Sequence, residues 1–131
     1  QKIEELQMED IKGLVDMDAL QAFRDRALNS ENPVTRGTAQ NPDIYFQGRE
    51  ASNKFYDAVP DMVADYMDKI SAITGRKYRP FDYYGAADAE NIIIAMGSVT
   101  ETIREVIDYE NANGQKVGMI AVHLYRPFSA K

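Results

Sequence analysis

Apolar positions in the first part of the chain recur at the three- and four-residue spacing of helices. Residues 3–11 carry apolar side chains among acidic ones, which predicts a short amphipathic helix. A second helix is expected to begin at Asp16 or Asp18, whose carboxylates can cap it, and to end at the turn-forming residues 29–33. A polar, extended loop over residues 33–43 should follow, because its prolines bias the residues before them away from helix.

Two more helices are predicted after this loop, over residues 45–57 and 60–74. Pro60 suits the first turn of the second of these, where its missing N–H leaves no hydrogen bond unmade. Gly75 is a natural stop at the other end. This second helix has the clearest apolar stripe in the chain, formed by side chains three and four residues apart: Met62, Val63, Tyr66, Met67, Ile70 and Ile73.

The pattern changes in the last third of the chain, where runs of strand length replace the helical stripes. Residues 91–96 form a largely continuous apolar run, which is typical of a strand covered on both faces. Residues 99–113 then show a helical stripe, and residues 117–125 form a second strand-like run. The order strand, helix, strand predicts a parallel pair joined by a right-handed crossover.

Two parallel strands do not make a stable sheet by themselves. Either the helices over 60–74 and 99–113 cover both faces of the pair, or neighbouring strands are missing, and we favour the second interpretation. Residues 81–85 are expected to form a short strand or an extended approach to one. The predicted fold class is therefore α/β: N-terminal helical segments and a long loop, followed by a βαβ unit of an incomplete parallel sheet.

Composition excludes several functions. The chain has 131 residues, of which 44% are hydrophobic, so it can build a core. Its formal charge is −6, with 21 acidic against 15 basic residues, which argues against nucleic acid as a partner. No apolar run approaches the roughly 20 residues of a membrane span, so we expect no membrane contact. The absence of cysteine excludes disulfides and thiolate metal sites and is compatible with a cytoplasmic protein.

A dense polar patch on the long loop is the first candidate site. Arg36, Thr38, Gln40 and Asn41 could line a cleft or bind a carboxylate, since arginine favours bidentate contacts. The same residues could equally satisfy backbone groups in a packed loop, and this structural or interface role is the favoured interpretation. Arg126 follows the second strand, where open α/β sheets often bind ligands, with interdomain packing as its alternative.

For the other candidate site residues, a structural role is the favoured interpretation. The turn at Gly97 and Ser98 could hold a phosphate, but Glu101 lies at the spacing of a capping box and would repel an anion. His123 is expected in the middle of the second strand and has no visible catalytic partner. No catalytic, cofactor-binding or metal-ligating residue is therefore assigned.

Seven short sequence blocks are distinctive and extend over nearly the whole chain. They are Arg-Gly-Thr-Ala-Gln-Asn-Pro-Asp-Ile-Tyr-Phe-Gln (36–47), Arg-Glu-Ala (49–51), Thr-Gly-Arg (74–76), Phe-Asp-Tyr-Tyr-Gly (81–85), Asp-Ala-Glu (88–90), Met-Gly-Ser (96–98) and Leu-Tyr-Arg-Pro-Phe-Ser (124–129). Together, and in this order and spacing, they resemble the pyruvate:ferredoxin (flavodoxin) oxidoreductases. A departure is Ala87, where the family commonly has proline.

The resemblance implies a much longer, homodimeric parent enzyme. That parent would decarboxylate pyruvate on thiamine diphosphate, pass electrons through [4Fe-4S] clusters to ferredoxin or flavodoxin, and form acetyl-CoA from CoA. Residues 1–76 would end its first domain, which contacts the thiamine pyrimidine ring. Residues 77–131 would begin its second, transketolase-C-terminal-like domain. The family's cluster and thiamine ligands lie outside these blocks, so the segment is expected to be structural and interdomain, to bind no cofactor, and to be inactive alone.

Two other functions remain open at this point. A non-catalytic module could use its acidic helical surface to bind a protein partner, and it would then need a self-contained fold. A nucleotide-binding α/β domain is a weaker possibility, because the chain lacks a glycine-rich phosphate loop and a Walker lysine.

Overall fold

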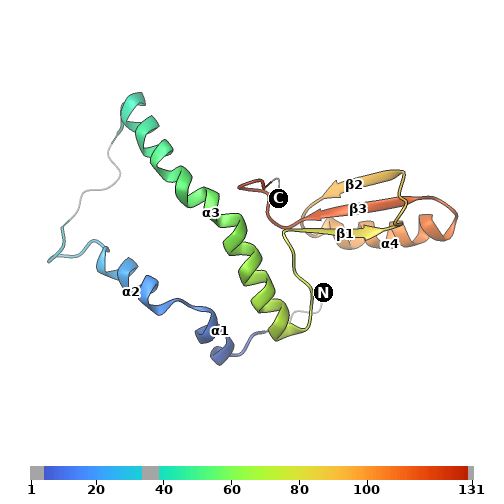
Figure 1. Cartoon of the computed structure of the whole chain (residues 1–131), viewed down its shortest axis with the longest axis horizontal. Coiled ribbons are helices and arrows are strands. Elements are labelled where there is room, and N and C mark those ends of the chain that lie inside the picture. The colour runs from blue at the N-terminus through green and yellow to red at the C-terminus, as the bar shows by residue number, and fades with distance from the viewer. Residues whose placement is uncertain (1–4, 34–38, 130–131) are drawn as a thin grey trace. The chain divides into compact units, whose positions relative to one another are not determined.

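The computed structural model describes residues 5–33 and 39–129 and divides the chain into two compact units, residues 1–54 and 55–131, each described by itself. Three helices come first in the chain, and a small α/β sheet unit follows (Figure 1). The elements are α1 (Met8–Leu14), α2 (Met17–Asp25), α3 (Pro42–Thr74), β1 (Phe81–Gly85), β2 (Asn91–Ala95), α4 (Val99–Ala112) and β3 (Val117–Val122).

The second N-terminal helix, α2, begins directly after its cap residue. Asp16 caps α2, because its carboxylate accepts a hydrogen bond of 2.9 Å from the N–H of Ala19. Neither α1 nor α2 has a buried residue, and Phe23 of α2 is 66% exposed. The apolar side chains of these two helices are therefore half-buried or exposed within the described residues. Residues 34–38 of the predicted loop lie outside the described residues.

The prediction of two helices over 45–57 and 60–74 is wrong. Helix α3 runs without interruption from Pro42 to Thr74, with Pro60 inside it (Figure 1). A proline within a helix removes one backbone hydrogen bond and crowds the preceding turn. The residues around Pro60 include no glycine and no second proline within ten positions, so the helical pattern continues on both sides of this single lost bond.

The three strands form one mixed sheet in the order β1-β3-β2. β2 and β3 are parallel and joined through α4, which confirms the predicted βαβ unit. Residues 81–85 are a strand, and it pairs antiparallel with β3, so the sheet is not purely parallel. β3 ends at Val122, which places His123 just beyond the strand and not in its middle. The N–H of His123 donates to the carbonyl of Pro80 at 2.9 Å.

Helix α4 ends as predicted but begins differently. Ser98 has helical backbone angles (φ −64°, ψ −22°) and its hydroxyl caps no backbone N–H, so the predicted capping box is absent. The hydroxyl of Thr100 instead donates to the carbonyl of Gly97 at 2.8 Å. At the other end, the Asn111 amide group bonds both the N–H and the carbonyl of Val117, which ties the end of α4 to the start of β3.

The core of the sheet unit lies between α4 and one face of the sheet. Ile107 of α4 meets Met119 and Ala121 of β3, and all three are at most 2% exposed. Partly buried side chains surround them: Tyr84, Ala95, Ile103 and Val117. The described residues therefore bury a core on one face of the sheet only.

Candidate functional site

The strand register divides the sheet into a covered face and an open face. Met119 and Ala121 point toward α4, so Ile120 and Val122 point the opposite way. Ile94 pairs with Ile120, and Phe81 pairs with Val122, which brings all three strands onto one apolar surface. We call this surface the open face; its side chains are Phe81, Tyr83, Ile92, Ile94, Ile120 and Val122.

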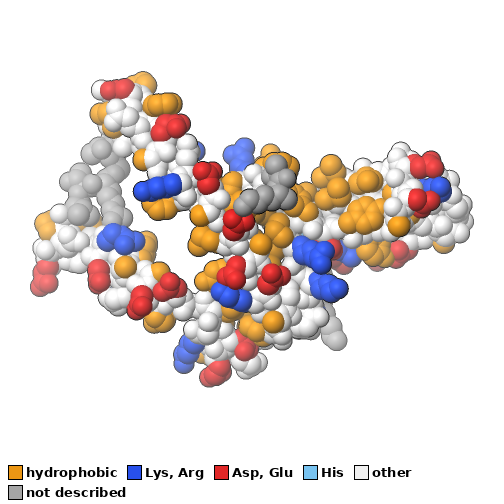
Figure 2. All heavy atoms as spheres, viewed as in Figure 1, with side chains coloured by type: hydrophobic (Ala, Val, Ile, Leu, Met, Phe, Trp, Pro, Cys, Tyr) orange, Lys and Arg blue, Asp and Glu red, His pale blue; other side chains and the backbone are white. Residues whose placement is uncertain are grey.

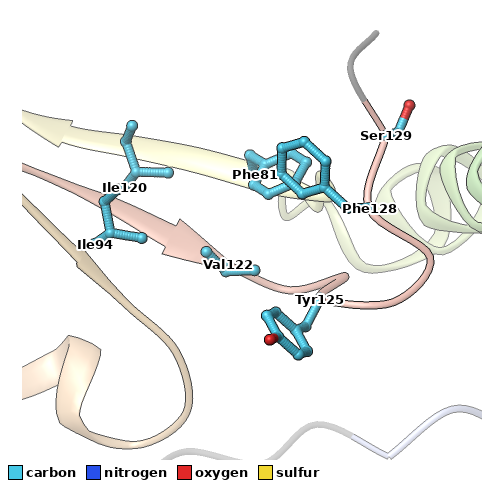
Figure 3. A pocket seen from close by; sticks show the side chains of 7 residues that line it. All are labelled: Phe81, Ile94, Ile120, Val122, Tyr125, Phe128 and Ser129. Carbon is cyan, nitrogen blue, oxygen red and sulfur yellow. The ribbon is translucent and has the colours of Figure 1, made fainter.

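The open face is apolar and exposed. Ile94 is 71% exposed, and Ile92 is 50% exposed. Hydrophobic side chains gather over the region of β2 and β3 in the space-filling view (Figure 2). A hollow of about 490 Å³ lies on this face, and nearly all of its lining is apolar: Phe81, Ile94, Ile120, Val122, Tyr125, Phe128 and Ser129 (Figure 3). Exposed apolar surface of this kind marks a place where another protein segment packs.

The segment that follows β3 turns onto the open face. The rings of Phe81 and Phe128 lie edge to face, with their centres 6.0 Å apart (Figure 3). Tyr125 and Ser129 line the same hollow. The Arg126 guanidinium lies 5.5 Å from the centre of the Tyr125 ring, a cation–π distance. Arg126 therefore belongs to the rim of this apolar surface.

Strand β2 is exposed on both of its faces. Ile93 points to the α4 side, yet it is 43% exposed, because β2 is an edge strand and α4 packs mainly on β3 and β1. Three consecutive isoleucines at an unprotected edge are a liability in a complete domain. Among residues 5–33 and 39–129, the prediction that the strands lack covering neighbours is confirmed for β2 and for the open face of β3. It fails for the rest of β3, which lies between β1 and β2 and is covered by α4.

Polar contacts hold the rim of the covered face. Arg104 of α4 pairs with Asp82 of β1 at 3.2 Å, and the Tyr84 hydroxyl donates to Asp108 at 2.7 Å. The hydrogen bond to Asp108 raises the pKa of Tyr84, and desolvation adds to the rise. Both pairs join β1 to α4, so their geometry accounts for a structural role in positioning these two elements.

Two of the four residues of the predicted polar patch lie within the described residues. Arg36 and Thr38 lie outside the described residues. Gln40 and Asn41 are exposed, and the carbonyl of Asn41 accepts from the N–H of Tyr45 at 2.9 Å, which begins α3. Gln40 and Asn41 belong to the first unit and Arg126 to the second.

The described residues contain neither a cluster of metal ligands nor a membrane-spanning helix. In residues 5–33 and 39–129, no group of three or more histidine or acidic side chains is placed to hold a metal ion. Iron–sulfur clusters need thiolates, and the chain has no cysteine, so its residues do not fit such a cluster. No helix within the same described ranges combines the length and the apolar character needed to cross a bilayer.

Sequence reasoning missed the residues that carry the open face. Phe81 was part of a segment of uncertain structure, and Ile120 was one apolar residue within a run. The available signal was alternation: in an extended strand, residues of the same parity share a face. Which residues of β1 and β2 join Ile120 depends on pairing across the sheet, which a local pattern does not specify.

These features define the chain as a segment of a larger α/β protein, because its sheet exposes an apolar face and an isoleucine-rich edge. The family model described as "Pyruvate flavodoxin/ferredoxin oxidoreductase, thiamine diP-bdg" matches residues 1–68, and that of "Pyruvate:ferredoxin oxidoreductase core domain II" matches residues 89–131. The chain belongs to the pyruvate flavodoxin/ferredoxin oxidoreductase family.

Curated relatives are similar over the whole chain. It is 66% identical over 131 residues to a pyruvate-flavodoxin oxidoreductase of Enterobacter agglomerans. It is 56% identical over 131 residues to a pyruvate:ferredoxin oxidoreductase of Moorella thermoacetica, and 52% identical over 130 residues to a probable pyruvate-flavodoxin oxidoreductase of Escherichia coli. These alignments cover 99–100% of this chain but 11% of each relative, so the chain spans about a ninth of their length.

Proposed function

We propose that these residues are a structural, interdomain segment of an enzyme that converts pyruvate and CoA to acetyl-CoA and CO₂. In this reaction the bond between the carboxylate and the carbonyl carbon breaks and CO₂ leaves. The remaining acetyl unit is oxidised to a thioester with CoA, and both electrons pass to ferredoxin or flavodoxin. The observation that carries the structural role is the open face, which a segment serving on its own would leave exposed to water.

We also propose that the segment joins two domains, with residues 1–76 at the end of the first and residues 77–131 at the start of the second. Support comes from a local change of structure: α3 ends at Thr74, Gly75 follows with φ +73°, and the sheet unit begins with β1. The two family models match on either side of residues 69–88, which is compatible with a junction there.

The cofactors and partners of the proposed enzyme lie in its other parts. Thiamine diphosphate is named in the description of the first family model. The chemistry also calls for one-electron carriers such as [4Fe-4S] clusters, whose thiolates must come from outside this cysteine-free segment. A homodimeric, cytoplasmic parent remains part of the same proposal. The alternative of an acidic interaction module is disfavoured, because a module serving on its own would leave the apolar open face in water.

The test compares the complete polypeptide with the 131-residue chain. Both are assayed for pyruvate- and CoA-dependent reduction of a viologen dye under anaerobic conditions, with omission of pyruvate as the blank. We expect turnover by the complete polypeptide and none by the chain alone. Turnover by the chain alone would contradict the structural role, and a complete, cofactor-loaded polypeptide without pyruvate-dependent reduction would contradict the activity.

A further inference from the structure

We propose that Asn113 is a site of slow covalent modification, in which the backbone nitrogen of Gly114 attacks the Asn113 side-chain amide and the asparagine becomes aspartate or isoaspartate. The site lies in the turn between α4 and β3. The inference goes beyond the proposed function, because this reaction needs only water and neither a cofactor nor pyruvate. The neighbouring residue, the exposure of the turn and the weak hold on its backbone support it.

The reaction has two balanced steps. First, the Gly114 nitrogen bonds to Cγ of Asn113 and gives up its proton through the solvent. The side-chain nitrogen gains that proton and leaves as ammonia, so a succinimide ring remains. Water then adds to one of the two ring carbonyls, and the C–N bond at that carbonyl breaks. Opening at the side-chain carbonyl gives aspartate, whereas opening at the backbone carbonyl gives isoaspartate, whose main chain runs through the former side chain.

The residue that follows distinguishes Asn113 from the other asparagines of the chain. Gly114 has no side chain, so its backbone nitrogen is open to attack geometry and its backbone angles can change freely. Proline follows Asn32 and Asn41, and its nitrogen carries no proton to lose. The remaining asparagines precede residues whose Cβ crowds the attacking nitrogen: Asn29, Asn53, Asn91 and Asn111.

The turn is open to water. Asn113 and Gly114 are both exposed, and a Cβ built on Gly114 would meet no atom within 4 Å beyond its chain neighbours. Water therefore reaches both reacting groups, and the space beside Gly114 is free. Asn111 differs in both respects, although it lies in the same helix end. It is half-buried, and its amide group bonds the N–H and the carbonyl of Val117 at 2.9 and 3.0 Å.

Two hydrogen bonds hold the turn in a shape that keeps the reacting groups apart. The ψ angle of Asn113 is 14°, which places the Gly114 nitrogen beside the Asn113 nitrogen, so attack on Cγ requires rotation about ψ. That rotation breaks the bond from the Gly114 N–H to the Asn111 carbonyl, at 3.1 Å. The side-chain amide must also leave the Tyr109 carbonyl, at 2.8 Å. Helix ends open far more readily than cores, so the fold slows the reaction without preventing it.

Modification weakens the junction between α4 and β3. The new carboxylate lies at the C-terminus of α4, where the last carbonyls already carry partial negative charge. A carboxylate also cannot donate to the Tyr109 carbonyl, as the amide of Asn113 does. Isoaspartate further lengthens the main chain by a methylene group just before β3. The bond from the Gln115 N–H to the Glu110 carbonyl, at 3.0 Å, spans this turn and is therefore the contact that should loosen first.

Peptide mass spectrometry of the complete enzyme, incubated at mildly alkaline pH, tests the reaction. Fragment ions separate Asn113 from the internal control Asn111, and a sample unfolded in guanidinium chloride gives the unprotected rate. We expect Asn113 of the folded enzyme to convert at least about 10-fold faster than Asn111, with both aspartate and isoaspartate formed. An Asn113 still intact after about 100 half-times of the unfolded sample would overturn the proposal. Aspartate without isoaspartate would also overturn it, because direct hydrolysis does not involve Gly114.

Hydrogen exchange tests the structural consequence. Asn113→Asp in the complete enzyme supplies the new carboxylate directly, and Asn53→Asp is the matched control, since it adds the same charge within α3. We expect the Gln115 amide to exchange at least about 5-fold faster in Asn113→Asp than in the unchanged enzyme, and equally fast in Asn53→Asp. An unchanged Gln115 amide in Asn113→Asp would overturn the proposed weakening. Neither experiment measures dye reduction, so a failure of the proposed function would leave both results readable.

Discussion

The two faces of the small sheet have similar side chains but different surroundings. On the covered face, Met119 and Ala121 are 0% and 2% exposed because Ile107 and the rest of α4 lie over them. On the open face, Ile94 is 71% exposed although its chemistry is just as apolar. An apolar strand face is therefore a face suited to being covered, whether or not the covering segment lies within these residues. The apolar pattern does not say which segment provides the cover.

The largest expected effect comes from the centre of the covered face. Met119→Ala should lower the free energy of unfolding by about 2–5 kcal/mol, because it leaves a cavity beneath α4. Urea denaturation of the 131-residue chain, followed by circular dichroism, measures the loss. The matched control is Ile94→Ala on the open face, which should change the same quantity by no more than about 0.5 kcal/mol. Equal losses would break the distinction between the two faces.

A second prediction concerns the glycines that let β1 approach β3. A Cβ at Gly85 would lie 2.6 Å from the Gly118 Cα and 2.6 Å from the Val117 carbonyl oxygen, and φ is +126°. Gly85→Ala should therefore lower the free energy of unfolding by at least about 2 kcal/mol, because backbone atoms in the way of the added Cβ cannot move without disturbing the strand pairing.

Gly118→Ala is the control for this prediction. Its added Cβ would meet the end of the Tyr83 side chain on the open face. Tyr83 is 45% exposed, so its ring can rotate away at the cost of the hydrogen bond that its hydroxyl donates to the Ala86 carbonyl. We expect a loss of about 1 kcal/mol or less in the same urea experiment. A larger loss for Gly118→Ala than for Gly85→Ala would mean that the open face is as tightly packed as the covered one.

Sequence patterns predicted the elements whose signals are local. β2, α4 and β3 follow from a strand-length apolar run, a helical stripe and the stop at Asn113 and Gly114, where Gly114 has φ +86°. The continuous α3 was missed, because a proline signals a possible helix start and neighbouring residues decide whether a break occurs. The end of β3 was placed three residues too late, since apolar residues continue past Val122 into the segment that turns onto the open face.

The candidate site was less predictable than the fold. Polar residues of the long loop were predicted as a site because side-chain chemistry can be read directly from the sequence. In the structure, Gln40 and Asn41 are exposed residues just before α3. The open face depends on the pairing of Phe81 with Val122 and of Ile94 with Ile120, which joins residues far apart in the chain. Such pairings are set by the whole sheet and not by local spacing.

A third, smaller effect is expected at the rim of the covered face. Asp82→Asn breaks the partly buried ion pair with Arg104. It should lower the free energy of unfolding by about 0.5–1 kcal/mol. Asp88→Asn is the matched control, because its pair with Lys116 at 2.9 Å is solvent-exposed and should be worth about 0–0.5 kcal/mol. Urea denaturation at low and high salt measures both variants. If both variants lower the free energy of unfolding equally, the Arg104–Asp82 pair stabilises the fold no more than an exposed surface pair does.

The smallest expected effect is a shift in the pKa of Tyr84, whose hydrogen bond to Asp108 joins β1 to α4. The hydrogen bond to Asp108 holds the pKa of Tyr84 above the ordinary value of 10.0, because the protonated phenol is the donor. A raised folded-state pKa means that the contribution to stability is fully present below pH 10.0 and is lost as the pH rises through the folded-state pKa. Carbon-13 NMR of the tyrosine ring Cζ measures the titration.

Three variants separate the causes of the raised Tyr84 pKa. Asp108→Ala removes both acceptor and charge and should lower this pKa toward 10.0, whereas Asp108→Asn keeps an acceptor and should lower it less. Glu105→Gln removes a carboxylate from the same helix without touching this hydrogen bond, and the Tyr84 pKa should then change least. A Tyr84 pKa that Asp108→Ala leaves unchanged would mean that desolvation sets it. The contact between β1 and α4 would then rest on the apolar core and the Arg104–Asp82 pair.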